Sequence, residues 1–516
     1  MPRSATLTPA IGDTPLLAVR DVHKSFPGVK ALRGVSFSVA AGSIHALVGE
    51  NGAGKSTIMN VLFGFTEPDS GTIELAGQSL RINGPHDAIA SGIGMVHQHF
   101  MLVDDMTVVE NVALAHARVR RPRMRLHELS RRVRELSTEY GLSIDPDSCI
   151  KDLSVGEQQR VELIKVLSAD PALIVLDEPT AVLTGTEWQQ LRIVLRRLAD
   201  DGRTIIFITH KLDEVMSLSD RATVMRSGEA VATFERAEFD KNALATAMVG
   251  RQVDLKNRSP VQPAGPSRLS CAGLSLRTDG RRGISGVDLD VKAGEIVAIA
   301  GVDGNGQTEL VYAIVGLAVP DSGTICLDGN VISDANPDRF RQVGGAYIPS
   351  DRGARGIAAS LPVLDNALLN RGLRTAHTRR GILDVAAARR QVSELAADYG
   401  VRMAGLDTPI GLLSGGNQQK IVLARELHDA PKLLIAAQPT RGLDIGACEY
   451  LYTQLRNFRD NGGAVLLIST ELEEVLNVSD RTHVMVDGTL SQSYDTRTLT
   501  LDQLGLLLGG EGFGDR

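Results

Sequence analysis

Cysteine is scarce in this sequence, and the few cysteines that occur are widely separated. The chain has 516 residues and four cysteines, none of them in the C-x-x-C spacing of a zinc site. They are Cys149, Cys271, Cys326 and Cys448. Neither a zinc site nor a disulfide framework is indicated, and a reducing compartment fits this composition.

Long apolar runs are also absent. No run approaches the roughly 18 residues of a membrane span. The opening stretch, MPRSATLTPAIGDTP, lacks the apolar core of a signal peptide. We therefore expect a cytosolic protein whose role at a membrane would come through a partner.

The chain has no excess of positive charge. Its net charge is −7, which argues against a broad cationic face for nucleic acid, so no nucleic-acid partner is expected. The basic run RVRRPRMRLHELSRRVR, residues 118–134, is a local exception. It predicts a solvated arginine-rich helix with a loop before it.

The first positive signal is the stretch GENGAGKST at residues 49–57, which has the full G-x-x-x-x-G-K-[ST] pattern. Glycines in such a loop let successive backbone N–H groups point at phosphate oxygens, at the positive end of the following helix. Lys55 would lie on the β- and γ-phosphates, and the Ser56 hydroxyl on Mg²⁺. The alternative is an ordinary glycine-rich turn. The context disfavours it, because IHALV (44–48) reads as a buried strand and TIMNVLFG (57–64) as an apolar helix.

The chain contains an internal repeat. GVDGNGQTE at 301–309 follows the first loop by 252 positions, and DSGTI at 69–73 recurs at 321–325 with the same offset. LSVGEQQR (153–160) matches LSGGNQQK (413–420), and LIVLDEPT (173–180) matches LLIAAQPT (433–440), both at an offset of 260. A period this long predicts two copies of one domain, with a net insertion of eight residues in the second.

These matches predict the domain boundaries. We expect an N-terminal tail over residues 1–15, a first domain over 16–256, a Pro- and Gly-containing linker over 257–268, and a second domain over 269–510. Each copy reads as an α/β core with a β subdomain and a helical insert. In LIVLDEPT a buried strand ends in Asp177 and Glu178, at the sheet edge where ligands bind, and Mg²⁺ would offset their charge.

The motifs GENGAGKST, LSVGEQQR, LIVLDEPT and ITHKL, in this order, resemble those of the ATP-binding subunits of ABC transporters. Two such units in one chain resemble the monosaccharide and nucleoside importers of bacteria. The resemblance implies that Lys55 and Ser56 hold the phosphates and Mg²⁺ and that Asp177 supports the metal. It also implies that Glu178 polarises the attacking water and that His210 contacts the γ-phosphate.

Two further roles follow from the resemblance. Gln98 in GMVHQHFMLVD would sense Mg²⁺ and water and communicate with the membrane subunits, and Phe26 in KSFPG would stack on adenine. The alternatives are a plain core residue for Phe26 and surface polar residues for Gln98 and His210. The positions implied to contact ATP in the first copy are Phe26, Gly49, Asn51, Gly52, Gly54, Lys55, Ser56 and Thr57.

The two LSGG-type segments differ. A serine followed by glycines at a helix start presents N–H groups and a hydroxyl to an anion. In this family that cap meets ATP across the interface with the other copy. The second copy is intact at Ser414, Gly415, Gly416, Asn417 and Asp444, which we expect to bind ATP. The first keeps Ser154 and Gly156 but has Val155 and Thr184 at altered positions, so a composite site of first-copy loop and second-copy signature is expected.

The second copy has lost the chemical groups of the first. Lys55 becomes Gln307, Phe26 becomes Thr278, Gln98 becomes Ser350, Asp177 becomes Ala437, Glu178 becomes Gln438 and His210 becomes Thr470. Each lost electrostatic partner reduces the rate by on the order of 10²- to 10³-fold. We therefore expect a degenerate site, formed by Gly301, Gly304, Gly306, Gln307, Thr308, Ser154 and Gly156, that retains a phosphate nest without hydrolysis. The alternative is that the second copy has no nucleotide role.

The resemblance implies an ATPase at the cytoplasmic face of the bacterial plasma membrane, bound to two permease subunits. An external substrate-binding protein or lipoprotein would feed it, and one chain would supply both nucleotide domains. GMVHQHFMLVD and AAQPTRGLD look most like nucleoside importers, with ribose or galactose importers next. A soluble tandem ATPase acting on the ribosome and a non-hydrolysing regulatory binder are the alternatives. The short, weakly charged linker and the degraded second site disfavour the first, and the intact acids disfavour the second.

Overall fold

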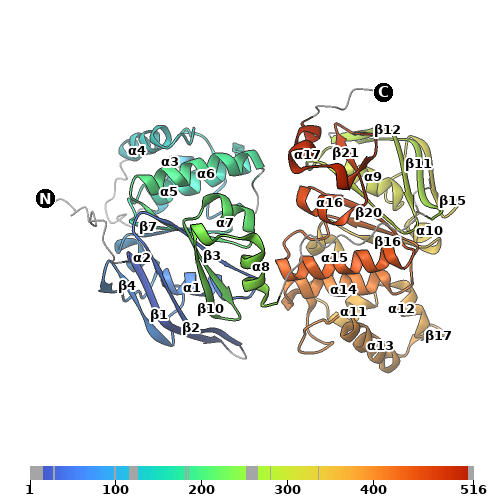
Figure 1. Ribbon diagram of the computed structural model, residues 1–516, viewed down its shortest axis with the longest axis horizontal. Coiled ribbons are helices and arrows are strands. Elements are labelled where there is room, and N and C mark those ends of the chain that lie inside the picture. Colours follow the sequence, from blue (N-terminus) through green and yellow to red (C-terminus); the bar gives the residue numbers. More distant parts are fainter. Residues whose placement is uncertain are drawn as a thin grey trace. The chain divides into compact units, whose positions relative to one another are not determined.

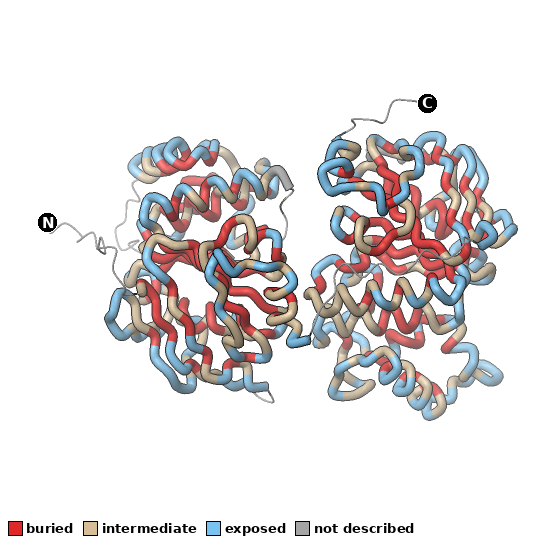
Figure 2. The backbone as a smooth tube through the Cα atoms, in the orientation of Figure 1, coloured by how far each residue is buried: buried red, intermediate tan, exposed pale blue. Residues whose placement is uncertain are grey.

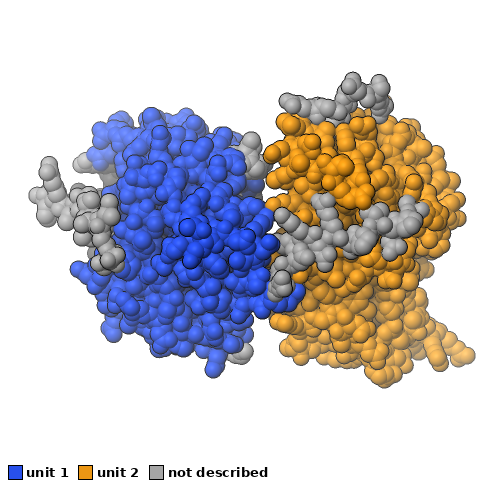
Figure 3. Space-filling model, viewed as in Figure 1, with its two compact units in different colours: residues 1–253 blue, residues 254–516 orange. Residues whose placement is uncertain are grey.

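The chain forms two compact units, residues 1–253 and 254–516 (Figure 3). The computed structural model describes residues 15–26, 29–97, 100–115, 126–180, 183, 185–251, 265–278, 281–334 and 336–509. Within these ranges no helix is both long enough and apolar enough to cross a membrane.

The first unit contains two sheets (Figure 1). One is antiparallel with strand order β2-β1-β4-β5, and the other has order β10-β9-β3-β8-β7-β6. The strands are β1 (Leu17–Phe26), β2 (Val29–Val39), β3 (Ile44–Gly49), β4 (Ser70–Leu75), β5 (Gln78–Ser79), β6 (Ile93–Val96), β7 (Leu173–Asp177), β8 (Thr204–Thr209), β9 (Arg221–Arg226) and β10 (Glu229–Glu235). Strands β6, β7, β8, β3 and β9 run parallel, so their carboxyl ends meet at one edge.

Both faces of this parallel sheet are covered, which is why its strands are continuous apolar runs. Along β7, Ile174 and Leu176 face one hydrophobic cluster, whereas Leu173 and Val175 face another. Figure 2 shows the central strands as buried. The helices are α1 (Lys55–Leu62), α2 (Pro85–Ala90), α3 (Val108–Ala115), α4 (Leu126–Glu139), α5 (Val155–Leu167), α6 (Gly185–Asp200), α7 (Leu212–Leu218) and α8 (Lys241–Val249), with short 3₁₀ helices η1 (Ile150–Asp152) and η2 (Arg236–Glu238).

The second unit repeats this plan. Its antiparallel sheet has order β12-β11-β14-β15, and its seven-stranded sheet follows β16-β19-β20-β13-β21-β22 with β23 paired to β21. The strands are β11 (Ser267–Thr278), β12 (Arg281–Lys292), β13 (Glu295–Ala300), β14 (Ser322–Leu327), β15 (Asn330–Val331), β16 (Gly345–Ile348), β19 (Leu433–Ala437), β20 (Ala464–Ser469), β21 (Arg481–Val486), β22 (Thr489–Leu490) and β23 (Tyr494–Asp495). The α/β fold class expected from the repeat is confirmed.

The helices of the second unit follow the same order as those of the first, with additions in the helical region. They are α9 (Gln307–Ile314), α10 (Pro337–Gln342), α11 (Val363–Ala367), α12 (Arg371–Ala376), α13 (Val385–Asp398), α14 (Gly415–Leu427), α15 (Ile445–Asp460), α16 (Leu472–Val478) and α17 (Leu501–Leu508), with η3 (Arg352–Gly356), η4 (Ile410–Leu412) and η5 (Thr496–Thr498). A two-stranded hairpin, β17 (Thr378–Arg379) and β18 (Ile382–Leu383), lies in the stretch where the repeat offset changes from 252 to 260.

The basic run of the first unit falls partly outside the described residues. Its described portion, from residue 126, lies in α4, where Arg131 and Arg134 are exposed and pair with Glu135 and Asp147. That portion is therefore the solvated helix that the sequence predicts.

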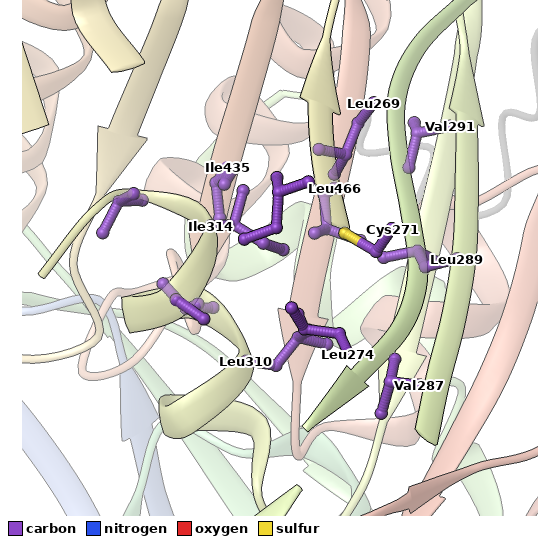
Figure 4. Close-up of a cluster of buried hydrophobic side chains, with 14 of the residues drawn as sticks. Leu269, Cys271, Leu274, Val287, Leu289, Val291, Leu310, Ile314, Ile435 and Leu466 are labelled. Carbon is purple, nitrogen blue, oxygen red and sulfur yellow. The ribbon is translucent and has the colours of Figure 1, made fainter. Parts of the chain in front are cut away.

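One hydrophobic cluster joins the two sheets of the second unit. Leu274 of β11, Leu310 of α9, and Ile435 and Leu466 of the parallel strands are fully buried in it (Figure 4). Since α9 begins at the end of the phosphate loop, this packing fixes the loop relative to the sheet.

Replacing Leu274 by alanine should leave a cavity in this cluster and destabilise the protein by about 2–5 kcal/mol. Calorimetric unfolding should show a lowered transition temperature. Leu506→Ala is the control, because Leu506 is 55% exposed on α17. Equal transition temperatures for the two variants would contradict the packing role.

Candidate functional site

The loop between β3 and α1 depends on its glycines. Gly52 and Gly54 have φ angles of 83° and 101°, in the left-handed region that side chains other than glycine rarely adopt. At Gly49 a Cβ atom would lie 2.3 Å from the carbonyl oxygen of Met225. The backbone therefore wraps the N-terminus of α1 as a phosphate-binding loop does.

Lys55 lies across this loop and is only 5% exposed. Its ammonium donates hydrogen bonds to the carbonyl oxygens of Gly49, at 2.7 Å, and Glu50, at 3.0 Å. These neutral carbonyls hold the cation at the mouth of the loop, where phosphate oxygens would compete for it. Ser56 is exposed beside it and Thr57 is half-buried.

Two acids lie at the carboxyl end of β7, where Asp177 is the last residue of the strand and Glu178 follows it. Asp177 is 8% exposed, and burial together with the charge of Glu178 raises its pKa to about 6, against the opposing effect of Lys55. Coupling to Lys55 places both acids in the electrostatic field of the loop cation. A buried carboxylate with a raised pKa is a group that a bound cation would stabilise in its ionised form.

Glu178 takes a left-handed backbone conformation, with φ 46°, and its N–H donates to the carbonyl of Ile208 on β8. This turn brings its Oε1 to 3.0 Å from Nδ1 of His210, which directly follows β8. Burial favours the neutral acid, but the hydrogen bond and charge of His210, with Lys55 and Lys211, outweigh it and lower the pKa of Glu178. The carboxylate is therefore ionised at neutral pH and held in place by His210.

A buried brace that the sequence reasoning missed connects the two loops that carry these groups. Glu214 on α7 accepts hydrogen bonds from Thr180, at 2.6 Å, and Thr209, at 2.5 Å. Thr180 lies two residues after Glu178, and Thr209 directly precedes His210. The brace thus fixes the spacing of the Glu178–His210 pair.

The same brace occurs in the second unit, where Glu474 accepts hydrogen bonds from Thr440 and Ser469 at 2.9 and 2.5 Å. Each member follows its counterpart by 260 positions, the offset of the surrounding repeat. The recurrence of these polar residues at the repeat offset is the sequence feature from which the hydrogen-bonded cluster could have been predicted.

The phosphate loop of the second unit keeps its shape. Gly304 and Gly306 have φ angles of 89° and 108°, and Gly301 packs directly against the side chain of Gln307, which is 7% exposed. Gln307 donates to the carbonyl of Val302 at 3.0 Å, as Lys55 does to Glu50. Thr308 is exposed, like Ser56.

The positions of the second unit that match the predicted catalytic residues are neutral. Gln438 repeats the left-handed turn of Glu178, with φ 41°, but its amide donates to Asp303 of the phosphate loop at 2.6 Å. Ala437 is buried at the position of Asp177, and Thr470 is exposed at that of His210. The frame of the site is retained without the Lys, Asp, Glu and His of the first unit.

The two signature helices are capped by different chemistry. In the first unit Ser154 caps α5 and donates its hydroxyl to the carboxylate of Glu157 at 2.7 Å, and hydrogen bonds from Ser154 lower the pKa of Glu157. In the second unit Ser414 caps α14 and accepts from the amide of Asn417 at 2.9 Å, which leaves its own proton available.

The signature glycines also differ in their surroundings. A Cβ on Gly156 would lie 2.1 Å from a carboxylate oxygen of Glu187, whereas Gly416 faces the Cβ of Ala447. Gly415 lies against the guanidinium of Arg352. The N-terminus of α5 thus has carboxylates where that of α14 has neutral and cationic groups.

The remaining predicted residues are placed as follows. Phe26 is 45% exposed at the end of β1, so it is not a core residue. Asp444 caps α15 by accepting from the N–H of Ala447 at 2.8 Å. Asn51 and Gly52 are exposed in the phosphate loop. Gln98 and Thr184 lie outside the described residues, and so does the side chain of Thr278.

Fold and site together define a tandem pair of phosphate-loop nucleotide-binding domains. The model of the ABC transporter family matches residues 32–181 and 284–441. This chain belongs to the ABC transporter family.

Curated relatives match almost the whole chain. The nucleoside import ATP-binding protein NupA of Lactococcus lactis is 43% identical over 95% of this chain and 97% of its own. The guanosine import ATP-binding protein NupO of Bacillus subtilis is 42% identical over 96% and 97%. The glucose import ATP-binding protein TsgD13 of Haloferax volcanii is 40% identical over 96% of both chains.

The buried brace predicts a pH dependence of stability. Burial raises the pKa of Glu474 from 4.5 to about 7, so the stability that it contributes is complete below about pH 4.5 and is lost as the pH rises through 7. Glu474→Gln removes this titration. Between pH 5 and pH 8 the variant should lose less stability than the wild type, by on the order of 2–3 kcal/mol.

Thermal unfolding across this pH range measures the effect. Glu473→Gln, at the adjacent exposed position, should behave as the wild type does. The same pH dependence in wild type and Glu474→Gln would show that Glu474 does not titrate in this range.

Proposed function

We propose that this chain is the ATP-hydrolysing subunit of a bacterial importer, and that the imported substrate is a nucleoside. The observation that carries the ATPase proposal is the ionised Glu178, held by His210 beside Asp177 and Lys55 at the carboxyl edge of the sheet. The nucleoside proposal is supported by two relatives, one named as a nucleoside import protein and the other as a guanosine import protein. A simple sugar is the second candidate, because a third relative imports glucose.

Binding of ATP would use the phosphate loop. Its N–H groups and the N-terminus of α1 attract the anionic phosphates, and Lys55 exchanges its carbonyl partners for phosphate oxygens. Phe26 is 45% exposed at the end of β1, so its ring is accessible for stacking on adenine.

The residues present fit a Mg²⁺ ion, which prefers oxygen ligands and usually keeps several waters. Ser56 offers an exposed hydroxyl, Asp177 a buried carboxylate with a raised pKa, and Gln98 is assigned here from the sequence. When bound, the ion would neutralise the charge of the β- and γ-phosphates.

Hydrolysis needs a group that orients water toward the γ-phosphate. Glu178 is ionised, so it can accept a hydrogen bond from that water. His210 forms a hydrogen bond with the Glu178 carboxylate and so holds it in position. In the second unit Gln438 and Ala437 have no charge with which to perform these steps. We therefore assign hydrolysis to the first unit.

The proposal extends to partners and location. The chain would bind two permease subunits at the cytoplasmic face of the plasma membrane, with an external substrate-binding protein delivering the substrate. The relatives' description as import ATP-binding proteins supports this assignment.

Glu178→Gln should bind ATP and hydrolyse it at least ~10²-fold more slowly, because the amide cannot take the role of the carboxylate. Phosphate release and ATP binding by the purified chain measure the two effects. The control is Gln438→Ala at the matching position of the second unit, which should retain turnover. Near-normal turnover of Glu178→Gln would refute the assignment.

We also propose that the signature serine of the second unit contributes to hydrolysis and that of the first does not. Ser414 keeps a hydroxyl proton available, whereas Ser154 donates its proton to Glu157. A phosphate near α5 would also be repelled by the carboxylates of Glu157 and Glu187.

Ser414→Ala should therefore reduce the ATPase rate of the assembled transporter by about tenfold or more, and Ser154→Ala by much less. Both substitutions remove one cap hydroxyl, so each controls for the effect on helix stability. A larger loss with Ser154→Ala would contradict the assignment.

A further inference from the structure

The second unit contains a cavity of about 310 Å³ that the proposed function does not use. Its polar lining consists of Ser350, Asp351, Arg352, Gln419, Gln438 and Arg441. All lie within the second unit. At about 30 Å³ per water, the cavity has room for roughly ten waters, or for a diphosphate group.

The cavity lies where the first unit has its water-activating groups. Gln438 stands at the position of Glu178, and Ser350 at that of Gln98. The amide of Gln438 joins the cavity to the phosphate loop, because it donates to Asp303 at 2.6 Å. Gln438 therefore lies between the cavity and the retained phosphate loop.

Two guanidinium groups line the cavity. Arg352 donates to Gln418 at 3.1 Å, and an Nη of Arg441 lies 3.4 Å from Oε1 of Gln438. Among the described residues neither forms an ion pair with a carboxylate. Burial lowers the pKa of Arg352, against the opposing effect of the Asp351 carboxylate. The matching positions of the first unit are Phe100 and Ala181, so both arginines are particular to the second unit.

A buried amide also faces this space. Gln419 on α14 is 4% exposed and lines the cavity. Its amide can donate a hydrogen bond to a phosphate oxygen. Of the nearby acids, Asp351 accepts from the N–H of Ala354 and its charge also acts on Arg352, whereas Asp303 accepts from Gln438.

The balance of charge differs between the two sites. The first unit sets two acids, Asp177 and Glu178, against Lys55, so an anion there needs a metal ion. The second unit lacks all three charges and has Arg352 and Arg441 instead, together with the acids Asp351 of the lining and Asp303 of the phosphate loop. Paired guanidiniums bind phosphate oxygens directly.

We propose that this cavity binds the terminal phosphates of a nucleotide held in the second phosphate loop, and that it does so without a divalent cation. The retained glycine loop supplies N–H groups to the inner phosphates, and the two arginines replace the lysine and metal ion of the first unit. The proposal does not depend on hydrolysis in the first unit.

The test uses the full chain with Lys55→Ala, which weakens the first site, in EDTA. Calorimetry should detect ATP binding near one per chain. Adding Arg441→Gln or Arg352→Gln should weaken it at least tenfold, the loss expected for a charge-assisted hydrogen bond. Arg441 is exposed, so its replacement should not disturb folding. The control is Arg389→Gln, which alters only an exposed pair with Asp407 and should leave binding unchanged.

Absence of ATP binding to Lys55→Ala in EDTA would overturn the proposal, as would an equal loss with Arg389→Gln. Pyrophosphate and inorganic phosphate distinguish the ligand sources. Weaker binding of both than of ATP is expected. Binding of pyrophosphate or phosphate but not of ATP would mean that the cavity takes free phosphate and would overturn the assignment to a nucleotide.

Discussion

The pair of acids at the end of β7 is the constraint on which the rest of the first site depends. Asp177 and Glu178 are placed together at the carboxyl edge of a parallel sheet, where burial opposes the ionisation of both carboxyls and nearby positive charge is needed to offset it. Lys55 from the phosphate loop and His210 from the end of β8 provide it. The sheet order sets β3 and β7 on either side of β8, and this brings the three loops to one edge.

Comparison with the second unit separates the features of this site that maintain its backbone structure from the side chains proposed to act on ATP. The second unit keeps the left-handed turn at Gln438, the glycine conformations of the loop and the buried brace at Glu474. It lacks the charged groups Lys55, Asp177, Glu178 and His210 of the first unit, and Thr278 and Ser350 stand at the positions of Phe26 and Gln98. Gln307 donates to the carbonyl of Val302 as Lys55 does to that of Glu50, so a side-chain hydrogen bond across the loop is retained. The frame therefore persists without the hydrolytic groups.

Local patterns predict part of this site, and distant contacts determine the rest. The phosphate loop at 49–57 and the acids at the end of a buried strand can be predicted from the sequence, because the glycine spacing and the apolar strand pattern each span only a few consecutive residues. The Glu214 brace depends on residues 34 and 5 positions away, and the approach of Glu187 to Gly156 depends on the packing of two helices. The Arg352 and Arg441 cavity likewise joins segments that only folding brings together.

The central claim is that one chain combines one hydrolytic unit with one non-hydrolytic unit. Vanadate trapping of a photoreactive ATP analogue in the presence of Mg²⁺, followed by mass-spectrometric mapping of the labelled peptides, tests it directly, because vanadate retains nucleotide only where the γ-phosphate has been cleaved. The account predicts vanadate-dependent label in the phosphate-loop peptide of the first unit, residues 49–57, and none in that of the second unit, residues 301–309. Equal vanadate-dependent label in the two phosphate-loop peptides would contradict it.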